Sequence, residues 1–227
     1  MSRNARLATV LGAFVVAVGL VVAAVAVYLT PGIPGGVVDF TKAQPAGAPV
    51  NLTVQTVGQI GFGPHPTWVS YLVKSPSGKW MHATDWKLPA NTVINMTVLQ
   101  YDSGSPLRNQ QWGQVEGVAG SLVSLNGTPF GTYDSYTGNG VGHTFTVPSL
   151  GIVVPLVGVA ANAANICGVA PCATTFDHNT ITFSFKTPGP GNFQWQCFVP
   201  CGLGYLYGNG GPMSVQNYMG GYLEVVR

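Results

Sequence analysis

The chain has 227 residues, enough for one β domain of ordinary size and a membrane anchor but too few for two large domains. Charged residues make up only 7% of it, against roughly 25% in typical soluble proteins. The formal net charge of +2 comes without a basic cluster, which argues against nucleic-acid binding, and the 7 acidic residues include no pair spaced for hydrolysis. One hypothesis for the low charge is life at acidic pH, because a protein with few carboxylates loses little stability when they become protonated.

The N-terminus carries an apolar run that is long enough to cross a bilayer. Residues 7–29 contain no charged side chain, and as a helix they would cover the roughly 30 Å hydrocarbon core. Arg3 and Arg6 precede the run and the next basic residue is Lys42, so we expect a cytoplasmic segment 1–6 and a single-pass protein of the cell membrane whose remainder lies outside. A cleaved signal peptide is the alternative, although its apolar region would be about 7–15 residues long.

Residues 30–40 are rich in Pro and Gly and predict a short stalk, which leaves residues 41–227 as one extracytoplasmic domain. Segments of strand-like composition there alternate with turn signals, without a convincing amphipathic helix. The candidate strands are residues 51–57, 68–73, 92–99, 180–186, 192–197 and 221–226. This pattern predicts an all-β fold, a β-sandwich.

Two stretches between these strands have a distinct composition. Residues 102–142 are rich in Gly, Asn and Ser and predict a long, ordered excursion between strands. Residues 188–191, with the sequence Pro-Gly-Pro-Gly, separate two alternating apolar strands and predict a hairpin. In the second of these strands Phe193 and Trp195 share a face, and we expect them to fill the core.

The four cysteines form two close pairs. Cys167 and Cys172 predict a structural disulfide that pins their loop in an oxidising compartment. Cys197 ends a predicted strand and Cys201 is followed by Gly202, so two thiols share a tight loop where both sulfurs can point to a common centre. Soft thiolates select copper, zinc or iron–sulfur clusters. Copper sites of this kind usually add a histidine and a weak methionine sulfur.

Two segments carry a resemblance to a known family. Residues 143–151, HTFTVPSLG, resemble the segment of cytochrome oxidase subunit II that holds the first histidine of its binuclear copper centre, CuA. Residues 188–202, PGPGNFQWQCFVPCG, resemble the same family's turn, strand and Cys-x₃-Cys-Gly loop. The resemblance implies a cupredoxin-like Greek-key β-sandwich behind one N-terminal transmembrane helix. It also implies a copper centre, with the ligands His143, Cys197, Cys201 and Met213.

The sequence departs from the family at one ligand. The pattern Cys-Gly-x-x-His places the second histidine where this chain has Tyr205, and no histidine follows His178. Met213 takes the place of the family's methionine only if the loop is longer here. One interpretation is a single copper in an unusual thiolate-rich site. The other is that copper has been lost, as in quinol-oxidising relatives, and that the cysteines of the loop form a disulfide or are free buried thiols.

Other residues are candidates for a missing ligand. His65 and His82 lie in other loops and could supply an imidazole, although most such histidines are turn or surface residues. His178, beside Asp177 in a polar turn, is a weaker candidate. Met219 could replace the sulfur of Met213, but a methionine close to a final strand more often packs in the core.

The resemblance and the anchor together favour electron transfer. The first hypothesis is a non-catalytic subunit II-like component of a haem–copper terminal oxidase in a respiratory chain. Its partners would be the membrane, the oxidase's catalytic subunit, and a redox donor protein or quinol. The alternative is a free-standing membrane-tethered cupredoxin, copper-binding or copperless, with a carrier or structural role.

Overall fold

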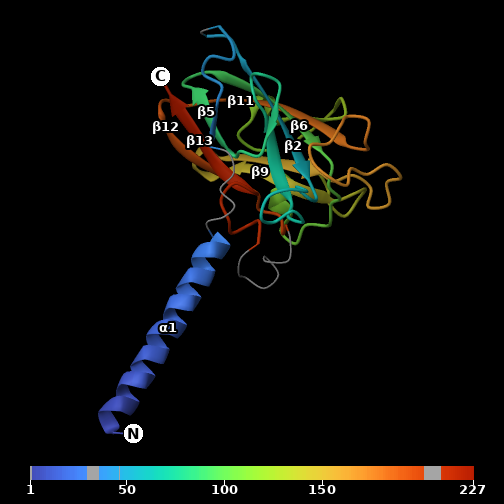
Figure 1. The fold of residues 1–227 in the computed structure, drawn as a ribbon. Helices are drawn as coiled ribbons and strands as arrows, with labels where there is room; N and C mark the ends of the chain where they lie inside the picture. Colours follow the sequence, from blue (N-terminus) through green and yellow to red (C-terminus); the bar gives the residue numbers. More distant parts are fainter. Residues whose placement is uncertain (1, 30–35, 46, 202–210) are drawn as a thin grey trace.

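In a computed structural model of the chain, one N-terminal helix precedes a sandwich of two β-sheets (Figure 1). The structure describes residues 2–29, 36–45, 47–201 and 211–227. The elements are α1 (Arg3–Leu29), β1 (Val37–Asp39), β2 (Val50–Val57), β3 (Ser70–Lys74), β4 (Trp80–Met81), β5 (Asp85–Pro89), β6 (Val93–Gln100), the 3₁₀ turns η1 (Gln110–Gly113) and η2 (Ala119–Ser121), β7 (Val123–Leu125), β8 (Thr128–Phe130), β9 (Val141–Val147), η3 (Pro148–Leu150), β10 (Ile152–Val157), β11 (Asn179–Lys186), β12 (Gly191–Gln196) and β13 (Gly220–Val226).

Helix α1 has the length and composition of a membrane span. The stretch Arg3–Ala26 is apolar, and none of it is buried against the rest of the protein. A helix that is apolar on all sides needs an apolar environment. The helix expected from the sequence is therefore present, and by length and composition it fits a membrane span or a signal sequence.

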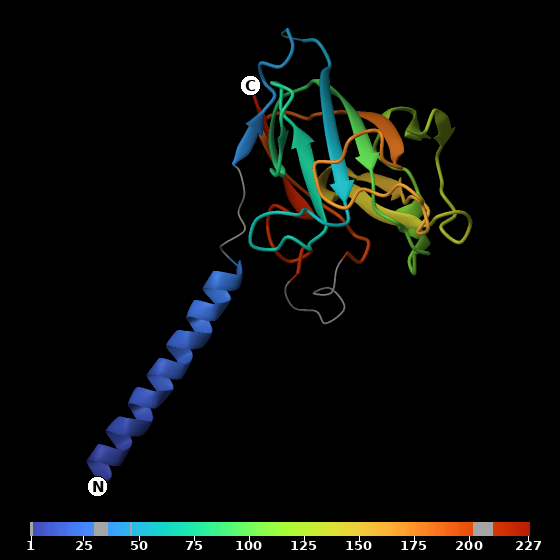
Figure 2. The same cartoon turned by 45° about the vertical axis from the view of Figure 1, so that its right-hand side comes forward.

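The two sheets form the layers of the sandwich, as the two views in Figures 1 and 2 show. One sheet has six strands in the order β1-β5-β13-β12-β9-β10, and the other has seven in the order β4-β3-β2-β6-β11-β7-β8. Large side chains fill the space between them, among them Trp86, Trp195 and Phe145 from the first sheet and Leu52 and Ile94 from the second. The all-β sandwich predicted from the sequence is confirmed.

The hairpin predicted around residues 188–191 is wrong. Strand β11 pairs with β6 and β7 in the seven-stranded sheet, whereas β12 pairs with β13 and β9 in the six-stranded sheet. The turn therefore carries the chain from one sheet to the other. Phe183 and Trp195 enter the core from opposite sheets. The ring centroid of Phe145 lies 5.8 Å from that of Phe183 and 5.5 Å from that of Trp195. Each strand alternates as it would in a hairpin, so the pattern does not distinguish the two arrangements.

The sandwich begins earlier than the predicted boundary at residue 41. Strand β1 pairs in parallel with β5, and the side chains of Val38 and Phe40 are only 4% and 2% exposed. A strand of three residues is too short to show a period in the sequence. The end of the predicted stalk is therefore part of the domain, while residues 30–35 lie outside the described residues.

The excursion predicted at residues 102–142 is ordered, and its strands are short. It contains η1, η2 and the small hairpin β7–β8, which extends the seven-stranded sheet beside β11. Asn126 and Gly127 form the turn of that hairpin, both with positive φ angles of 51° and 90°. An Asn-Gly pair tolerates this left-handed backbone, which a tight hairpin turn requires.

The pairing directions gather several strand ends at one end of the sandwich, here named the Cys197 end. Strand β13 runs antiparallel to β12 and so begins where β12 ends. Because β5 is parallel to β13, and β1 is parallel to β5, both also begin at this end. In the other sheet β2 and β6 run parallel and end here. The loops 58–69 and 158–178, and residues 197–201 and 211–219 of the loop after β12, therefore lie at the Cys197 end.

Candidate metal centre

Three donor side chains meet at the Cys197 end. His143 lies on β9, Cys197 directly follows β12, and Cys201 lies in the loop beyond. His143 Nδ1 is 3.0 Å from Cys201 Sγ and 3.9 Å from Cys197 Sγ, and the two sulfurs are 3.5 Å apart. All three side chains are buried. In the part of the chain that the structure describes, they are the one group of His, Cys, Asp and Glu donors compact enough to hold a metal ion.

Backbone and side-chain hydrogen bonds hold the first cysteine in place. The amide of Thr144 donates to Cys197 Sγ at 3.4 Å, and the amide of Phe198 donates to the hydroxyl of Thr144 at 2.9 Å. The amide of Cys197 donates to the carbonyl of Met219 at 2.8 Å, which continues the pairing of β12 with β13. Three strands therefore position Cys197 beside His143.

The pKa values of the three donors depend on their contacts with one another. Burial alone would raise the pKa of Cys197, but hydrogen bonds from Cys201 and His143 outweigh it and hold that pKa well below its usual value. The hydrogen bond to Cys197, together with burial, raises the pKa of Cys201 well above its usual value. Burial lowers the pKa of His143, yet the contacts with Asp102 and Cys197 raise it to about 9. A bound cation would take the place of these protons.

The donor set fits a soft metal ion. The two cysteines are free thiols, and their sulfur separation of 3.5 Å is well beyond the roughly 2 Å of a disulfide bond. Two thiolates and one imidazole are ligands that copper and zinc both accept. The buried position keeps bulk water from these ligands. The residues present therefore fit copper.

The structure places the two methionines differently. Met219 is buried in the core, beside Cys197 across the strand pair. The carbonyl of Met213 accepts a hydrogen bond from Gln196 Nε2 at 3.3 Å, and Met213 borders a cavity of about 110 Å³ with Gln194 and Gln196. These glutamines alternate with Trp195 and face away from the core. Met213 is also partly buried against the hydrophobic core, and its role as a ligand stays a prediction. Tyr205 lies outside the described residues.

The other three histidines have separate surroundings. His65 stacks on Trp68, with ring centroids 3.7 Å apart. His82 Nε2 is 2.8 Å from the hydroxyl of Ser70, and burial lowers the pKa of His82 to about 4. His178 lies close to the disulfide loop and stacks on the ring of Tyr101. None of these three belongs to the donor group found among the described residues.

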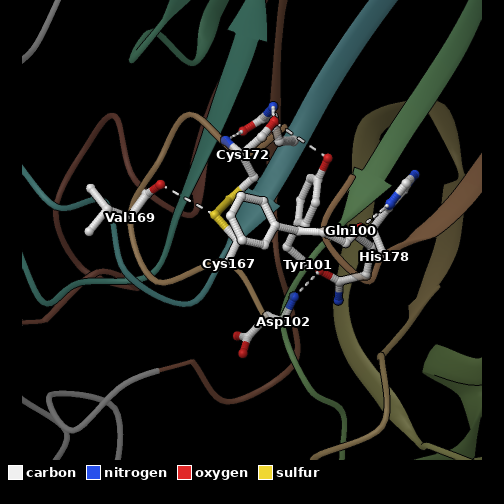
Figure 3. The surroundings of a disulfide bond; sticks show 9 residues. Gln100, Tyr101, Asp102, Cys167, Val169, Cys172 and His178 are labelled. Atoms are coloured by element: carbon white, nitrogen blue, oxygen red, sulfur yellow. Dashed lines mark hydrogen bonds between the residues drawn. A yellow bond between two sulfur atoms is a disulfide. The ribbon is translucent and has the colours of Figure 1, made fainter. Parts of the chain in front are cut away.

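Cys167 and Cys172 form the disulfide expected from the sequence (Figure 3). The fully buried side chain of Gln55, on β2, makes two hydrogen bonds to the backbone of Cys172. Gln55 Nε2 donates to the carbonyl at 2.9 Å, and Gln55 Oε1 accepts from the amide at 2.8 Å. Tyr101 Oη donates to the same carbonyl at 3.4 Å. These contacts fix the loop 158–178 to the strand beside it, which agrees with a structural role.

Sequence reasoning missed one residue of the site, Asp102. Its Oδ2 lies 3.2 Å from His143 Nε2, on the side of the imidazole ring away from the sulfurs. Both side chains border a cavity of about 580 Å³, which Trp68 and Cys201 also line. A lone aspartate in a Gly- and Ser-rich stretch has no local signature, because its partner lies in a strand of the other sheet.

Comparisons with known proteins gave structural neighbours only. No protein-family model matches the chain, and no curated protein matches it. A solved structure of rusticyanin, described as a copper protein, is 17% identical over 90% of this chain and 92% of its own, with a TM-score of 0.34. Rusticyanin from Thiobacillus ferrooxidans is 17% identical with the same coverage and a TM-score of 0.31. A multicopper oxidase is 11% identical over 81% of this chain and 45% of its own, with a TM-score of 0.28. Similarity at this level does not identify a shared function.

Proposed function

We propose that this protein is a membrane-anchored cupredoxin that binds copper between His143, Cys197 and Cys201 and transfers electrons as a subunit II-like component of a haem–copper terminal oxidase. The observation that carries the proposal is the buried group of two free thiols and one imidazole at one end of a β-sandwich. The segments that supply these donors are those that resemble the copper-binding segments of subunit II.

Copper held there would supply one-electron chemistry by cycling between its cuprous and cupric states. The protein's part is to fix the donors and to exclude water. Hydrogen bonds to Thr144 and to the backbone hold Cys197, and the carboxylate of Asp102 faces the imidazole of His143. Rigid, buried ligands favour electron transfer, because little has to move when the charge of the ion changes.

The short tether supports a partner in the membrane. Strand β1 begins at the Cys197 end, and only eight residue steps separate Leu29 of α1 from Val37. Such a segment reaches at most about 30 Å when fully extended. If α1 spans the bilayer, the tether therefore holds the Cys197 end close to the membrane surface.

The composition of the Cys197 end supports the same partner. The loops 58–69 and 197–219 contain no Lys, Arg, Asp or Glu. Four large apolar side chains are exposed in the described parts of the three loops at this end: Phe62, Ile166, Val169 and Phe198. Charged residues at this end are few, among them Asp102, Arg108 and Asp177. A largely apolar surface suits contact with a membrane-embedded protein better than with a charged soluble carrier.

Metal analysis of the purified full-length protein tests the proposal. Copper should bind and give a strong thiolate charge-transfer band, with the spin-resonance spectrum reporting whether one copper or two coppers sharing an electron are present. Replacing Cys197 or Cys201 by Ser should abolish the band, whereas replacing both Cys167 and Cys172 by Ala, the matched control, should leave it. A wild-type protein that binds no metal at saturating copper would refute the proposal.

The second candidate function is a free-standing membrane-tethered carrier. The missing second histidine at Tyr205 favours it, because an ordinary CuA centre needs that ligand. Mild solubilisation distinguishes the two: a subunit should purify together with a haem protein, and a carrier should purify alone.

A further inference from the structure

We infer that Asp102 is a positioning residue of the metal centre, which orients His143 so that its Nδ1 faces the two sulfurs. The inference rests on the proposed metal site and names a residue that neither the sequence motifs nor the resemblance contain. It assigns a function to the one carboxylate in contact with a donor of the metal group.

The two nitrogens of His143 have different partners. Nδ1 points at the sulfurs, 3.0 Å from Cys201 Sγ and 3.9 Å from Cys197 Sγ, while Nε2 lies 3.2 Å from Asp102 Oδ2. The latter contact is not aligned as a hydrogen bond, and Nε2 has no other hydrogen-bond partner among the described residues. A carboxylate beside Nε2 favours the tautomer that carries its proton on Nε2, and this tautomer keeps the Nδ1 lone pair free for a metal ion.

Asp102 is itself held rigidly. Its Oδ1 accepts a hydrogen bond from the amide of Ser103 at 2.8 Å, and its own amide donates to Gln100 Oε1 at 3.0 Å (Figure 3). The hydroxyl of Thr56 donates to the same oxygen of Gln100. The chain of contacts runs from β2 through β6 to Asp102 and ends on His143 in the other sheet. It therefore couples the two layers of the sandwich at the metal centre.

The backbone next to His143 is shaped for this contact. A side chain at Gly142 would place its Cβ 2.8 Å from the carbonyl oxygen of Ser103, closer than real Cβ atoms come. Glycine at this position lets the start of β9 approach the segment 100–103. The same segment carries Asp102 up to the imidazole ring, so the missing side chain is part of how the pair is built.

The carboxylate has access to water on one side only. The side chain of Asp102 is 30% exposed, whereas that of His143 is 1% exposed. In the contact between the two side chains, the imidazole of His143 is thus shielded from water, and the carboxylate of Asp102 is partly solvated. A partly solvated carboxylate can stay charged, and a charged partner strengthens the interaction with the Nε2 proton.

Three variants of the full-length protein test the inference. Cuprous copper affinity, measured by competition with a chelator, should fall about 10- to 100-fold in Asp102→Ala. Asp102→Asn should lose less, because its amide oxygen still accepts a hydrogen bond. Asp134→Ala is the matched control. This carboxylate also accepts a hydrogen bond from a backbone amide, that of Tyr136 at 3.0 Å, but it does not line the cavity beside His143, so the variant should bind copper as tightly as the wild type.

A second readout separates positioning from a general structural effect. In the zinc-loaded wild type, the Nε2 proton of His143 should give a protected imidazole NMR signal, and Asp102→Ala should lose that protection. If Asp102→Ala does not fold, Asp102→Asn carries both measurements. Wild-type affinity together with a protected signal in the variants would overturn the inference and leave the metal site standing. A wild type that binds neither copper nor zinc would overturn both.

Discussion

His143 and His82 are both buried, yet their pKa values shift in opposite directions. Burial opposes the charged form of each imidazole. At His143 the contacts with Asp102 and a thiolate outweigh burial and raise the pKa to about 9. At His82 burial dominates, and a hydrogen bond to the backbone of Asn217 compensates only in part, so the pKa falls to about 4. The other described neighbours of His82 are the hydroxyl of Ser70 and the rings of Phe62 and Tyr218, with no carboxylate among them.

This difference makes His82 an acid-sensitive residue. An unfolded chain binds a proton at His82 near pH 6.5, whereas the folded protein does so only near pH 4. The contribution of His82 to the free energy of unfolding should therefore be complete above pH 6.5 and be lost as the pH falls to about 4. The loss should approach about 3 kcal/mol.

Denaturant unfolding of the full-length protein in detergent, measured between pH 7 and 4, checks this expectation. Replacing His82 by Gln should remove that part of the pH dependence, whatever it does to stability at pH 7. Equal losses of stability in the wild type and the variant would contradict it. Since the chain has only 7 acidic residues, few carboxyl groups add their own pH dependence to the measured free energy of unfolding.

At the scale of elements, β1 shows how a short strand joins the anchor to the domain. Its three residues cover the edge of β5, and Val38 and Phe40 enter the core. The sequence assigns this stretch to a stalk because Pro and Gly precede it. The structure makes it the edge strand of the six-stranded sheet, so the tether leaves the sandwich at the Cys197 end.

Two truncated domains test the place of β1. A chain that begins at residue 36 should be more stable than one that begins at residue 41, because the shorter chain loses the burial of Val38 and Phe40. Each buried side chain is worth about 1.5–3 kcal/mol, so the difference in the free energy of unfolding should be about 3–6 kcal/mol as an upper estimate. Denaturant unfolding measures it. Val38→Ala in the longer chain should give an intermediate value, and equal stabilities of the two truncations would exclude β1 from the core.

At the scale of the whole molecule, charged residues are unevenly distributed along the strands, although Asp102, Arg108 and Asp177 lie at the Cys197 end. The loops 58–69 and 197–219 carry no charged residue, whereas Lys74, Lys79 and Lys186 lie at the opposite end of the sandwich. Figure 1 shows the chain's C-terminus at that opposite end. This polarity agrees with the proposal that the Cys197 end faces the membrane.

Energy transfer in vesicles tests the orientation. A fluorophore on Phe62→Cys at the Cys197 end should lie closer to an acceptor dye in the bilayer than a fluorophore on Lys79→Cys in the turn between β3 and β4. Strands of eight residues span about 26 Å, so the two labels should differ in height by roughly that length. The native free cysteines are buried and remain as they are. Equal or reversed transfer would contradict the proposed orientation.

Local patterns in the sequence predicted the apolar helix, six of the thirteen strands in the described part of the chain, and the two thiols of the metal centre. A run of apolar residues, an alternation of period two and a Cys-x₃-Cys-Gly loop are each visible within a short stretch of chain. The loop therefore pointed to Cys197 and Cys201, and the resemblance to subunit II added His143; the structure brings these three together.

Only the tertiary structure decided which sheet each strand joins and which residues surround the donors. The face of β12 that carries Trp195 is apolar whether the strand folds back on β11 or crosses to the other sheet, because both arrangements bury that face. Asp102 meets His143 through packing between two sheets, which no spacing in the sequence encodes. The position of Met213 depends likewise on the path of a loop. Contacts between distant segments follow from how the whole chain packs, and local patterns do not contain them.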